Sequence, residues 1–161
     1  MAGRLAVVAR PCGGDWLYDE FASLCRAGIQ TVVSLLEPEE ALELGLAAEH
    51  EAATASGVQF LVCPIPDRGV PASTDAAFAA LYQIAAKLES GENVALHCRQ
   101  GIGRAGMMTA GALKILGLST TSAVSAVSQA RGLEIPETPE QLAWLTQVCV
   151  GRPSAVPPKL N

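Results

Sequence analysis

The sequence predicts an α/β fold in which a central, largely parallel sheet of about four to five strands carries helices on both faces. Short apolar, β-branched runs alternate with longer segments whose apolar residues recur at helical spacing. Such alternation of strand and helix is typical of parallel sheets. The chain has 161 residues, half of them apolar, which is the size of one domain with a sizeable core.

The first half of the chain contains two predicted strand-helix units. Residues 5–10 form a short apolar run that ends at a proline and a glycine pair, and a helix capped by Asp15 follows as far as Gly28. Residues 31–36 are β-branched and apolar, which predicts the second strand. The EPEEALELG stretch behind them has the proline and the early carboxylates of a helix N-terminus.

The alternation continues in the second half. Residues 59–65 are the third predicted strand, and residues 73–90 place apolar side chains on one helical face. The fourth predicted strand, residues 93–98, leads into residues 104–116, which are apolar or small on nearly every side. This composition predicts a helix that is buried from all directions. Two more helices are predicted, at 121–131 and 139–150.

Composition also limits the compartments and the partners that we expect for the protein. The formal net charge of −5 argues against a broad basic surface for nucleic acid or anionic lipid. No apolar run approaches the roughly 20 residues that cross a bilayer, and the opening segment is too short for a signal-peptide core. Five cysteines without a pairing pattern fit a reducing compartment. We therefore expect one cytoplasmic domain over residues 1–150, without nucleic-acid or membrane partners, and a mobile tail over 151–161.

A glycine-rich loop, HCRQGIGRAG, follows the fourth strand. Gly101, Gly103 and Gly106 match the dinucleotide-binding pattern GxGxxG, but the following strand with its acidic residue is missing. A Walker loop is excluded because the chain contains no GK[ST]. A different interpretation starts from Cys98 and Arg104, which bracket five residues of this loop.

The loop from Cys98 to Arg104 is suited to a tetrahedral dianion. A chain that turns between a strand and a helix points successive backbone N–H groups into one concavity. These amides and the helix dipole would hold Cys98 as a thiolate, which makes it a nucleophile. Arg104 would then grip two oxygens of the anion in bidentate fashion. The residues therefore predict a phosphate site with a nucleophile inside it.

The HCRQGIGR stretch resembles the active-site signature of the protein tyrosine phosphatases, His-Cys-x5-Arg, in their compact dual-specificity-like branch. The stretch PIPDRGVP resembles the loop that carries the family's general-acid aspartate, which falls on Asp67. The stretch IPETPEQ resembles the segment that supplies a water-orienting glutamine, which falls on Gln141. The resemblance extends from about residue 10 to residue 150 and implies a phosphatase fold that hydrolyses phosphoric monoesters without a metal or another cofactor.

The resemblance also implies roles for individual residues. Cys98 would be the nucleophile, and Asp67 would protonate the leaving group and then deprotonate water. Asp67 also fits an ordinary Pro-Asp-x-Gly turn. Gln141 also fits a helix start in which Thr138 is the N-cap and a proline comes first. The predicted substrate-binding residues are Arg99, Gln100, Gly101, Ile102, Gly103 and Arg104, and the predicted supporting residues are His97, Ala105 and Gln141.

Three residues leave alternatives open. Arg99 fits an exposed surface as well as a substrate contact. Cys63 can pack in the core or form a regulatory disulfide with Cys98. Ala105 departs from the family, which usually has Ser or Thr there to stabilise the thiolate that leaves phosphorus. Loss of a hydrogen bond to a charged group, about 1.5–3 kcal/mol, would slow that step by roughly ten- to a hundred-fold.

The function expected from the sequence is a phosphatase that acts through a phosphocysteine intermediate on phosphotyrosine, in a protein or a small aryl phosphate. Pocket depth decides whether phosphoserine and phosphothreonine are also substrates. One alternative is a pseudophosphatase that binds phosphorylated ligands and turns them over too slowly to matter, which Ala105 favours. Another is a sulfurtransferase that uses Cys98 and has no need of Asp67.

Overall fold

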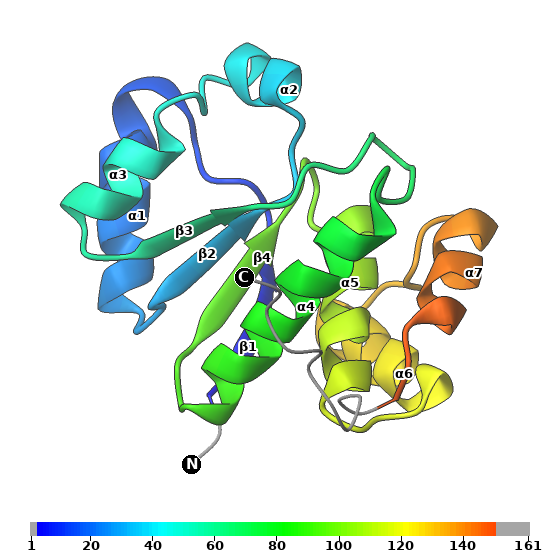
Figure 1. The fold of residues 1–161 in the computed structure, drawn as a ribbon. Coiled ribbons are helices and arrows are strands. Elements are labelled where there is room, and N and C mark those ends of the chain that lie inside the picture. The colour runs from blue at the N-terminus through cyan, green and yellow to red at the C-terminus, as the bar shows by residue number, and fades with distance from the viewer. Residues whose placement is uncertain (1–2, 151–161) are drawn as a thin grey trace, which may run out of the picture.

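The computed structural model describes residues 3–150 and contains one sheet of four parallel strands in the order β1-β4-β2-β3 (Figure 1). Every residue of the two central strands, β2 and β4, is buried. The fold class expected from the sequence is confirmed, whereas the tail predicted at 151–161 lies outside the described residues. The strands are β1 (Leu5–Val8), β2 (Thr31–Ser34), β3 (Gln59–Val62) and β4 (Val94–His97).

The strands end earlier than the apolar runs predict. β3 ends at Val62 rather than at residue 65, because Pro64 has no N–H to donate to the ladder. β4 ends at His97, so Cys98 is the first residue of the following loop. The backbone beyond the strands is still hydrogen bonded: the amide of Leu35 donates to the carbonyl of His97 over 3.0 Å. Backbone hydrogen bonds of this kind hold the loops at the carboxyl end of the sheet in place.

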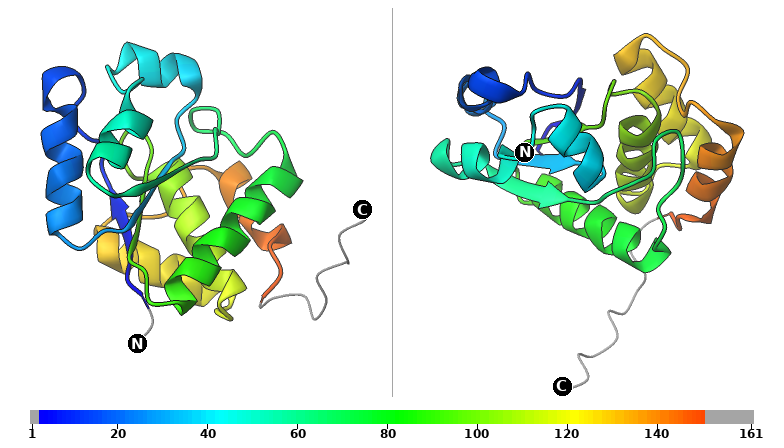
Figure 2. Two further views of the ribbon diagram at one scale, coloured as in Figure 1. Left: turned by 60° about the vertical axis from the view of Figure 1, so that its left-hand side comes forward. Right: turned by 90° about the horizontal axis from the view of Figure 1, so that it is seen from above.

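Helices α1 (Leu17–Arg26) and α3 (Glu49–Ala55) cover one face of the sheet (Figure 2). Phe21 of α1 packs edge-on against Phe60 of β3, with ring centroids 6.1 Å apart. α3 was not predicted, because its seven residues are too few to show a clear apolar period. A 3-10 turn, η1 (Gly14–Trp16), precedes α1 and contains Asp15, so this residue does not cap α1 as predicted.

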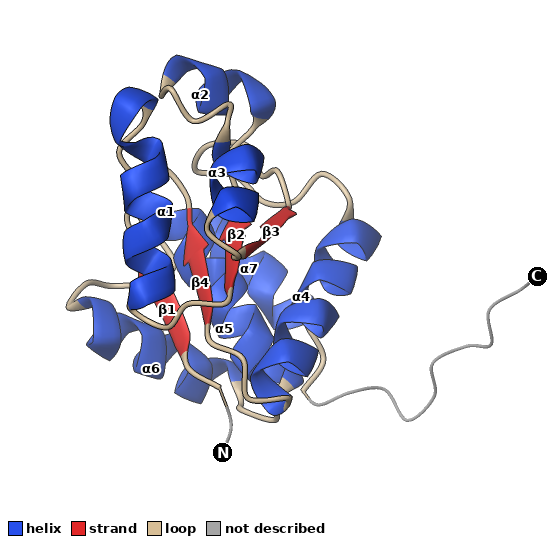
Figure 3. Cartoon of the chain, turned by 90° about the vertical axis from the view of Figure 1, so that its left-hand side faces the viewer, coloured by secondary structure: helices blue, strands red, loops and turns tan. Residues whose placement is uncertain are grey.

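The other face carries four helices, all predicted: α4 (Thr74–Glu89), α5 (Gly103–Ile115), α6 (Thr120–Arg131) and α7 (Pro139–Gln147). α5 lies in the middle and contacts the other three helices, β1 and β4 (Figure 3). All but one of its residues are buried, as their composition predicts. Within residues 3–150, no helix combines the length and the apolar character needed to span a bilayer.

Candidate active site

The candidate site lies at the carboxyl end of the sheet, where the loops after β2, β3 and β4 meet. Figure 3 shows β3 and β4 pointing toward the end of the molecule where α2 (Pro38–Glu43) lies. Ligands bind at this end of open parallel sheets. A cavity of about 170 Å³ opens there. It is lined by Asp67, Arg68, Cys98, Arg99, Gln100, Gly103, Arg104 and Glu137.

Cys98 lies at the base of the loop, with 3% of its surface exposed. The backbone amide of Gly101 donates a hydrogen bond to its Sγ over 3.3 Å. Gly101 has φ +69°, and a Cβ there would lie 2.5 Å from the carbonyl oxygen of Val8, so the turn requires glycine. Helix α5 starts at Gly103, which directs its N-terminus at the cavity. This is the amide-lined turn that the sequence predicts around Cys98.

Arg104 closes the loop and is 2% exposed. Its Nη1 donates to Oε2 of Glu40 over 2.6 Å and to the carbonyl of Ile65 over 2.9 Å. Its Nη2 donates to Oε1 of Glu40 over 3.1 Å and to Oδ1 of Asp67 over 2.9 Å. Four of the five guanidinium hydrogens are thereby engaged, and Nε remains for another acceptor. A phosphate in the loop therefore meets a guanidinium that is already fixed in orientation.

Glu40 is the functional candidate that sequence reasoning missed. Its carboxylate forms a bidentate pair with Arg104, and Oε2 also accepts a hydrogen bond from the backbone amide of Glu37. The hydrogen bond from Arg104 lowers the pKa of Glu40, with burial acting in the opposite direction. Burial disfavours the charge of Arg104, but the hydrogen bond and charge of Glu40 outweigh it, so the pKa of Arg104 is raised. The pair therefore stays ionised.

Glu40→Gln tests this pair through stability. The pKa of Glu40 is lower in the folded state than its ordinary 4.5. The stability that the ionised Glu40 gives to the folded protein is therefore present above about pH 4.5 and is lost as the pH falls. We expect the variant to lose about 2 kcal/mol of unfolding free energy at pH 7 and less near pH 4, measured by urea unfolding. Glu39→Gln, at the exposed neighbouring position, is the control. A loss of the same size at both pH values would contradict the ionised pair.

Asp67 lies in the loop between β3 and α4, and 56% of its side chain is exposed. The loop turns tightly after it: Arg68 has φ +58°, and the amide of Gly69 donates to the carbonyl of Pro66 over 2.9 Å. Arg68 also reaches across the cavity, with Nη1 3.4 Å from Oε1 of Glu137. The structure therefore brings the predicted acid to the mouth of the cavity that contains Cys98.

Gln141 is fully buried and connects two loops of the site. Its backbone amide donates to Oγ1 of Thr138, so Thr138 is the N-cap of α7 as predicted. Its side-chain Oε1 accepts from the amide of Glu137 over 3.1 Å, and its Nε2 donates to the carbonyl of Gly69 over 3.1 Å. Gln141 thereby holds the loop of Asp67, and its water-orienting role stays a prediction.

The predicted supporting residues are fully buried and do not line the cavity. His97 is fully buried, and its Nε2 lies 2.9 Å from Oε1 of Glu49 in α3, a partner that the sequence did not indicate. Ala105 is fully buried in the first turn of α5. Of the predicted substrate-binding residues, Gly101 and Ile102 do not line the cavity, whereas the other four do. Gly101 packs on β1, and Ile102 is the N-cap of α5.

The remaining candidates are Arg99 and Cys63. Arg99 is exposed in part, with Nη2 3.7 Å from Oε2 of Glu43. Cys63 is buried, belongs to the same apolar cluster as Cys98 and is a free thiol, as Cys98 is. Burial raises the pKa of Cys63, which keeps it protonated. Within residues 3–150, no three His, Cys, Asp or Glu side chains are grouped as metal ligands would be.

Comparison with known proteins agrees with this geometry. Residues 7–117 match the family model described as "Polymorphic toxin system, DSP-PTPase phosphatase". The structure of the phosphatase Tk-PTP in its G95A form is 30% identical, with 92% of this chain and 91% of that chain covered and a TM-score of 0.74. A search of curated proteins finds no match.

Two more distant structures share the fold. The kinase-associated phosphatase, with its catalytic-site cysteine replaced by serine, is 19% identical over 89% of this chain and 84% of that chain, with a TM-score of 0.81. Human DUSP28 is 21% identical over 89% of this chain and 90% of that chain, with a TM-score of 0.64. With the family model covering more than half of the chain, the protein belongs to the dual-specificity-like branch of the protein tyrosine phosphatase superfamily.

Proposed function

We propose that this phosphatase hydrolyses phosphotyrosine without a metal, through a phosphocysteine intermediate. One observation carries the proposal: Cys98, Arg104 and Asp67 line one cavity, with Asp67 2.9 Å from the guanidinium of Arg104. A nucleophile, an anion-binding group and a proton donor are the three parts that this hydrolysis needs. Arg104 and the loop amides supply the positive charge that stabilises the transferring phosphoryl group.

The reaction proceeds in two displacements. The Cys98 thiolate attacks phosphorus, the ester P–O bond breaks, and the protonated carboxyl of Asp67 gives its proton to the leaving phenolate. Water then attacks the phosphocysteine, gives a proton to the Asp67 carboxylate, and the P–S bond breaks. Inorganic phosphate leaves, and both the thiolate and the protonated acid are restored. Phosphate displaces Asp67 from Nη2 of Arg104 when it binds, which frees the acid to face the leaving group.

Burial of the nucleophile supports phosphotyrosine as the substrate. Cys98 is 3% exposed, so the phosphate has to reach the base of the cavity. An aryl phosphate stands further from its peptide backbone than a phosphoserine or phosphothreonine does. We expect phosphotyrosine peptides to have a higher kcat/KM than matched phosphoserine or phosphothreonine peptides.

Rapid-mixing kinetics with p-nitrophenyl phosphate near pH 6, with EDTA present, test the proposed function. A burst of one p-nitrophenol per protein, together with phosphate trapped on Cys98 by acid quench and located by mass spectrometry, supports the mechanism. Product formation that requires an added metal would refute it. Persulfide formed on Cys98 from thiosulfate, with no ester hydrolysis, would favour the sulfurtransferase instead.

Asp67→Asn tests the general acid by the choice of leaving group. We expect kcat/KM for phenyl phosphate to fall by about 10²-fold, because phenolate needs protonation as it leaves. The loss with p-nitrophenyl phosphate is expected to be much smaller, because p-nitrophenolate leaves without help. Asp75→Asn, at the exposed start of α4, is the control. Equal losses with both esters would contradict the role of Asp67.

Ala105→Ser tests the second displacement. The variant places a hydroxyl in the first turn of α5, where it can stabilise the departing thiolate. We expect steady-state turnover to rise by about ten-fold while the burst rate stays the same, measured in the same rapid-mixing experiment. Ala110→Ser adds the same hydroxyl further along α5 and should not raise turnover. If Ala105→Ser also leaves turnover unchanged, the missing hydroxyl at position 105 does not limit the second displacement.

A further inference from the structure

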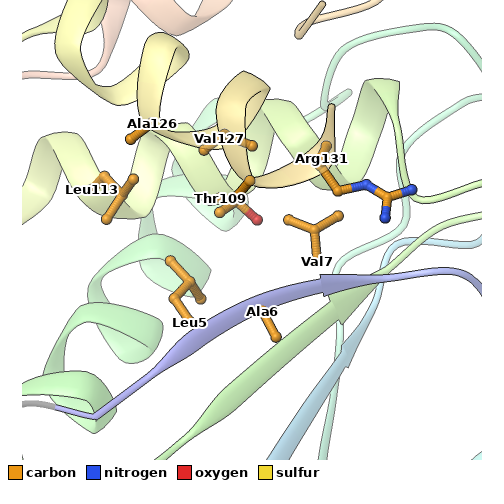
Figure 4. Close-up of a pocket in the computed structure, with 9 residues that line it drawn as sticks. Leu5, Ala6, Val7, Thr109, Leu113, Ala126, Val127 and Arg131 are labelled. Carbon is orange, nitrogen blue, oxygen red and sulfur yellow. The ribbon is translucent and has the colours of Figure 1, made fainter. Parts of the chain in front are cut away.

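A second cavity, of about 310 Å³, lies between strand β1 and helices α5 and α6 (Figure 4). No residue lines both this cavity and the one that contains Cys98. β1 is an edge strand, so the cavity lies along the free edge of the sheet. Its volume is within the range of small-molecule sites, about 300–1,000 Å³. The proposed phosphatase mechanism makes no use of it.

The cavity is apolar at one end and polar at the other. Figure 4 places Leu5, Leu113 and Ala126 toward one end, Arg131 at the other end, and Thr109 between them. The apolar end can take a hydrocarbon chain, because leucine and alanine side chains offer no hydrogen-bond partner. The polar end offers hydrogen-bond donors and a positive charge. A ligand that fits both ends is itself amphiphilic.

Thr109 places an unsatisfied group midway along the cavity. It is 4% exposed, and within residues 3–150 its hydroxyl oxygen has no hydrogen-bond partner. A threonine inside a helix commonly donates to a carbonyl of the preceding turn, but this one does not. Figure 4 shows its hydroxyl on the side of α5 that faces the cavity. A buried hydroxyl without a partner is unfavourable, and a ligand oxygen would satisfy it after a shift of the Thr109 side chain, because less than 1 Å² of its oxygen is accessible.

Arg131 gives the polar end its charge. Its Nε donates to the carbonyl of Gly101 over 2.9 Å, which fixes the guanidinium in place. Its Nη atoms have no hydrogen-bond or ion-pair partner among residues 3–150. The last turn of α6 accounts for a positive charge here, since it lies at the negative end of the helix dipole. The helix dipole does not explain why the Nη donors of Arg131 lie beside an apolar cavity without an acceptor.

We propose that this cavity binds an aliphatic monocarboxylate. Its chain lies along Leu5 and Leu113, and its carboxylate accepts hydrogen bonds from the Arg131 guanidinium and the Thr109 hydroxyl. An inorganic anion would leave the apolar end unfilled, and a neutral hydrocarbon would leave both donors unpaired. A cation would be repelled by Arg131. Among these four classes, the aliphatic carboxylate is the one that satisfies every feature of the cavity.

Binding of straight-chain carboxylates, from butanoate to octanoate, tests the proposal. Titrations followed by amide chemical shifts should place the ligand at residues 5–7 and 126–131 and give the Kd. We expect each added methylene to lower the Kd by about two- to four-fold. Hexylamine and 1-hexanol should bind at least about ten-fold more weakly than hexanoate, because neither pairs with Arg131. Each titration is run with and without excess inorganic phosphate, which occupies the loop around Cys98.

Two variants test where the carboxylate and the hydrocarbon chain of the ligand lie in the cavity. Thr109→Val should raise the Kd of hexanoate about five- to ten-fold without lowering the unfolding midpoint, because the hydroxyl makes no bond in the empty protein. Ala126→Phe, at an exposed position on the cavity wall, should block octanoate binding. Thr121→Phe, exposed on the same helix but outside the cavity, is its matched control and should bind normally.

Several outcomes would overturn the proposal. One is binding that phosphate competes away, since the ligand would then lie in the catalytic loop. Others are a Kd that does not depend on chain length, equal binding of hexanoate and hexylamine, or undiminished octanoate binding to Ala126→Phe. These outcomes are independent of the phosphatase mechanism, because the assay measures binding and requires no turnover.

Discussion

Cys98→Ser is expected to abolish hydrolysis of p-nitrophenyl phosphate, with a loss of about 10⁴-fold or more in kcat. A serine hydroxyl stays protonated at neutral pH, and no base in the loop is positioned to activate it. The loop itself should persist, because the amide of Gly101 can donate to an oxygen as it does to Sγ. We therefore expect phosphate to bind the variant at least as tightly as the native protein, since the negative thiolate is gone. Steady-state kinetics and calorimetric titration with phosphate measure the two effects separately.

Cys63→Ser is the matched control for this prediction. Cys63 is a buried thiol in the same apolar cluster, but burial raises its pKa and it does not line the catalytic cavity. Its replacement should cost some stability and leave kcat within a few-fold of the native value. If Cys98→Ser retained a substantial rate, or if Cys63→Ser lost as much activity, Cys98 would not be the nucleophile.

The sequence predicts most of the fold because the fold follows local periodicity. The β-branched runs and the helical apolar spacing each show within a dozen residues, and alternation then implies a parallel sheet. The loop from Cys98 to Arg104 is predictable for the same reason, since its residues are contiguous. α3 could not be predicted, because its seven residues are too few to show a helical apolar period. The positions at which the strands end could not be predicted, because apolar residues continue beyond them into buried loops.

The partners of the site residues could not be predicted from local pattern. Glu40 meets Arg104 because β2 lies beside β4, so the loops after these two strands are adjacent. The sequence separates the two residues widely, and the EPEE stretch is fully explained as a helix start. His97 and Glu49 meet for a comparable reason, across the sheet and α3. Contacts between residues that strand order brings together can be found only from the structure. Contacts between residues a few positions apart can be predicted from the sequence.

Arg104→Lys is expected to lower kcat/KM by about 10³-fold while the positive charge is kept. Lysine has three N–H donors on one nitrogen and lacks the planar fork. It cannot bond Glu40 and the Ile65 carbonyl and also grip two phosphate oxygens. The guanidinium fork, rather than the charge alone, is therefore the feature that this substitution removes. Kinetics with p-nitrophenyl phosphate and the affinity for inorganic phosphate both report the loss.

Glu40→Gln separates the positioning of Arg104 from its contact with phosphate. The amide keeps one oxygen that can accept from the guanidinium but loses the charge and the second acceptor. We expect kcat/KM to fall by about ten-fold, much less than for Arg104→Lys, because the carbonyl of Ile65 still holds the arginine after phosphate has displaced Asp67. Retention of native kcat/KM by Arg104→Lys would show that a point charge is sufficient in this loop. In that case the bidentate pair with Glu40 would serve stability alone, and the loss of unfolding free energy in Glu40→Gln at pH 7 would be its whole effect.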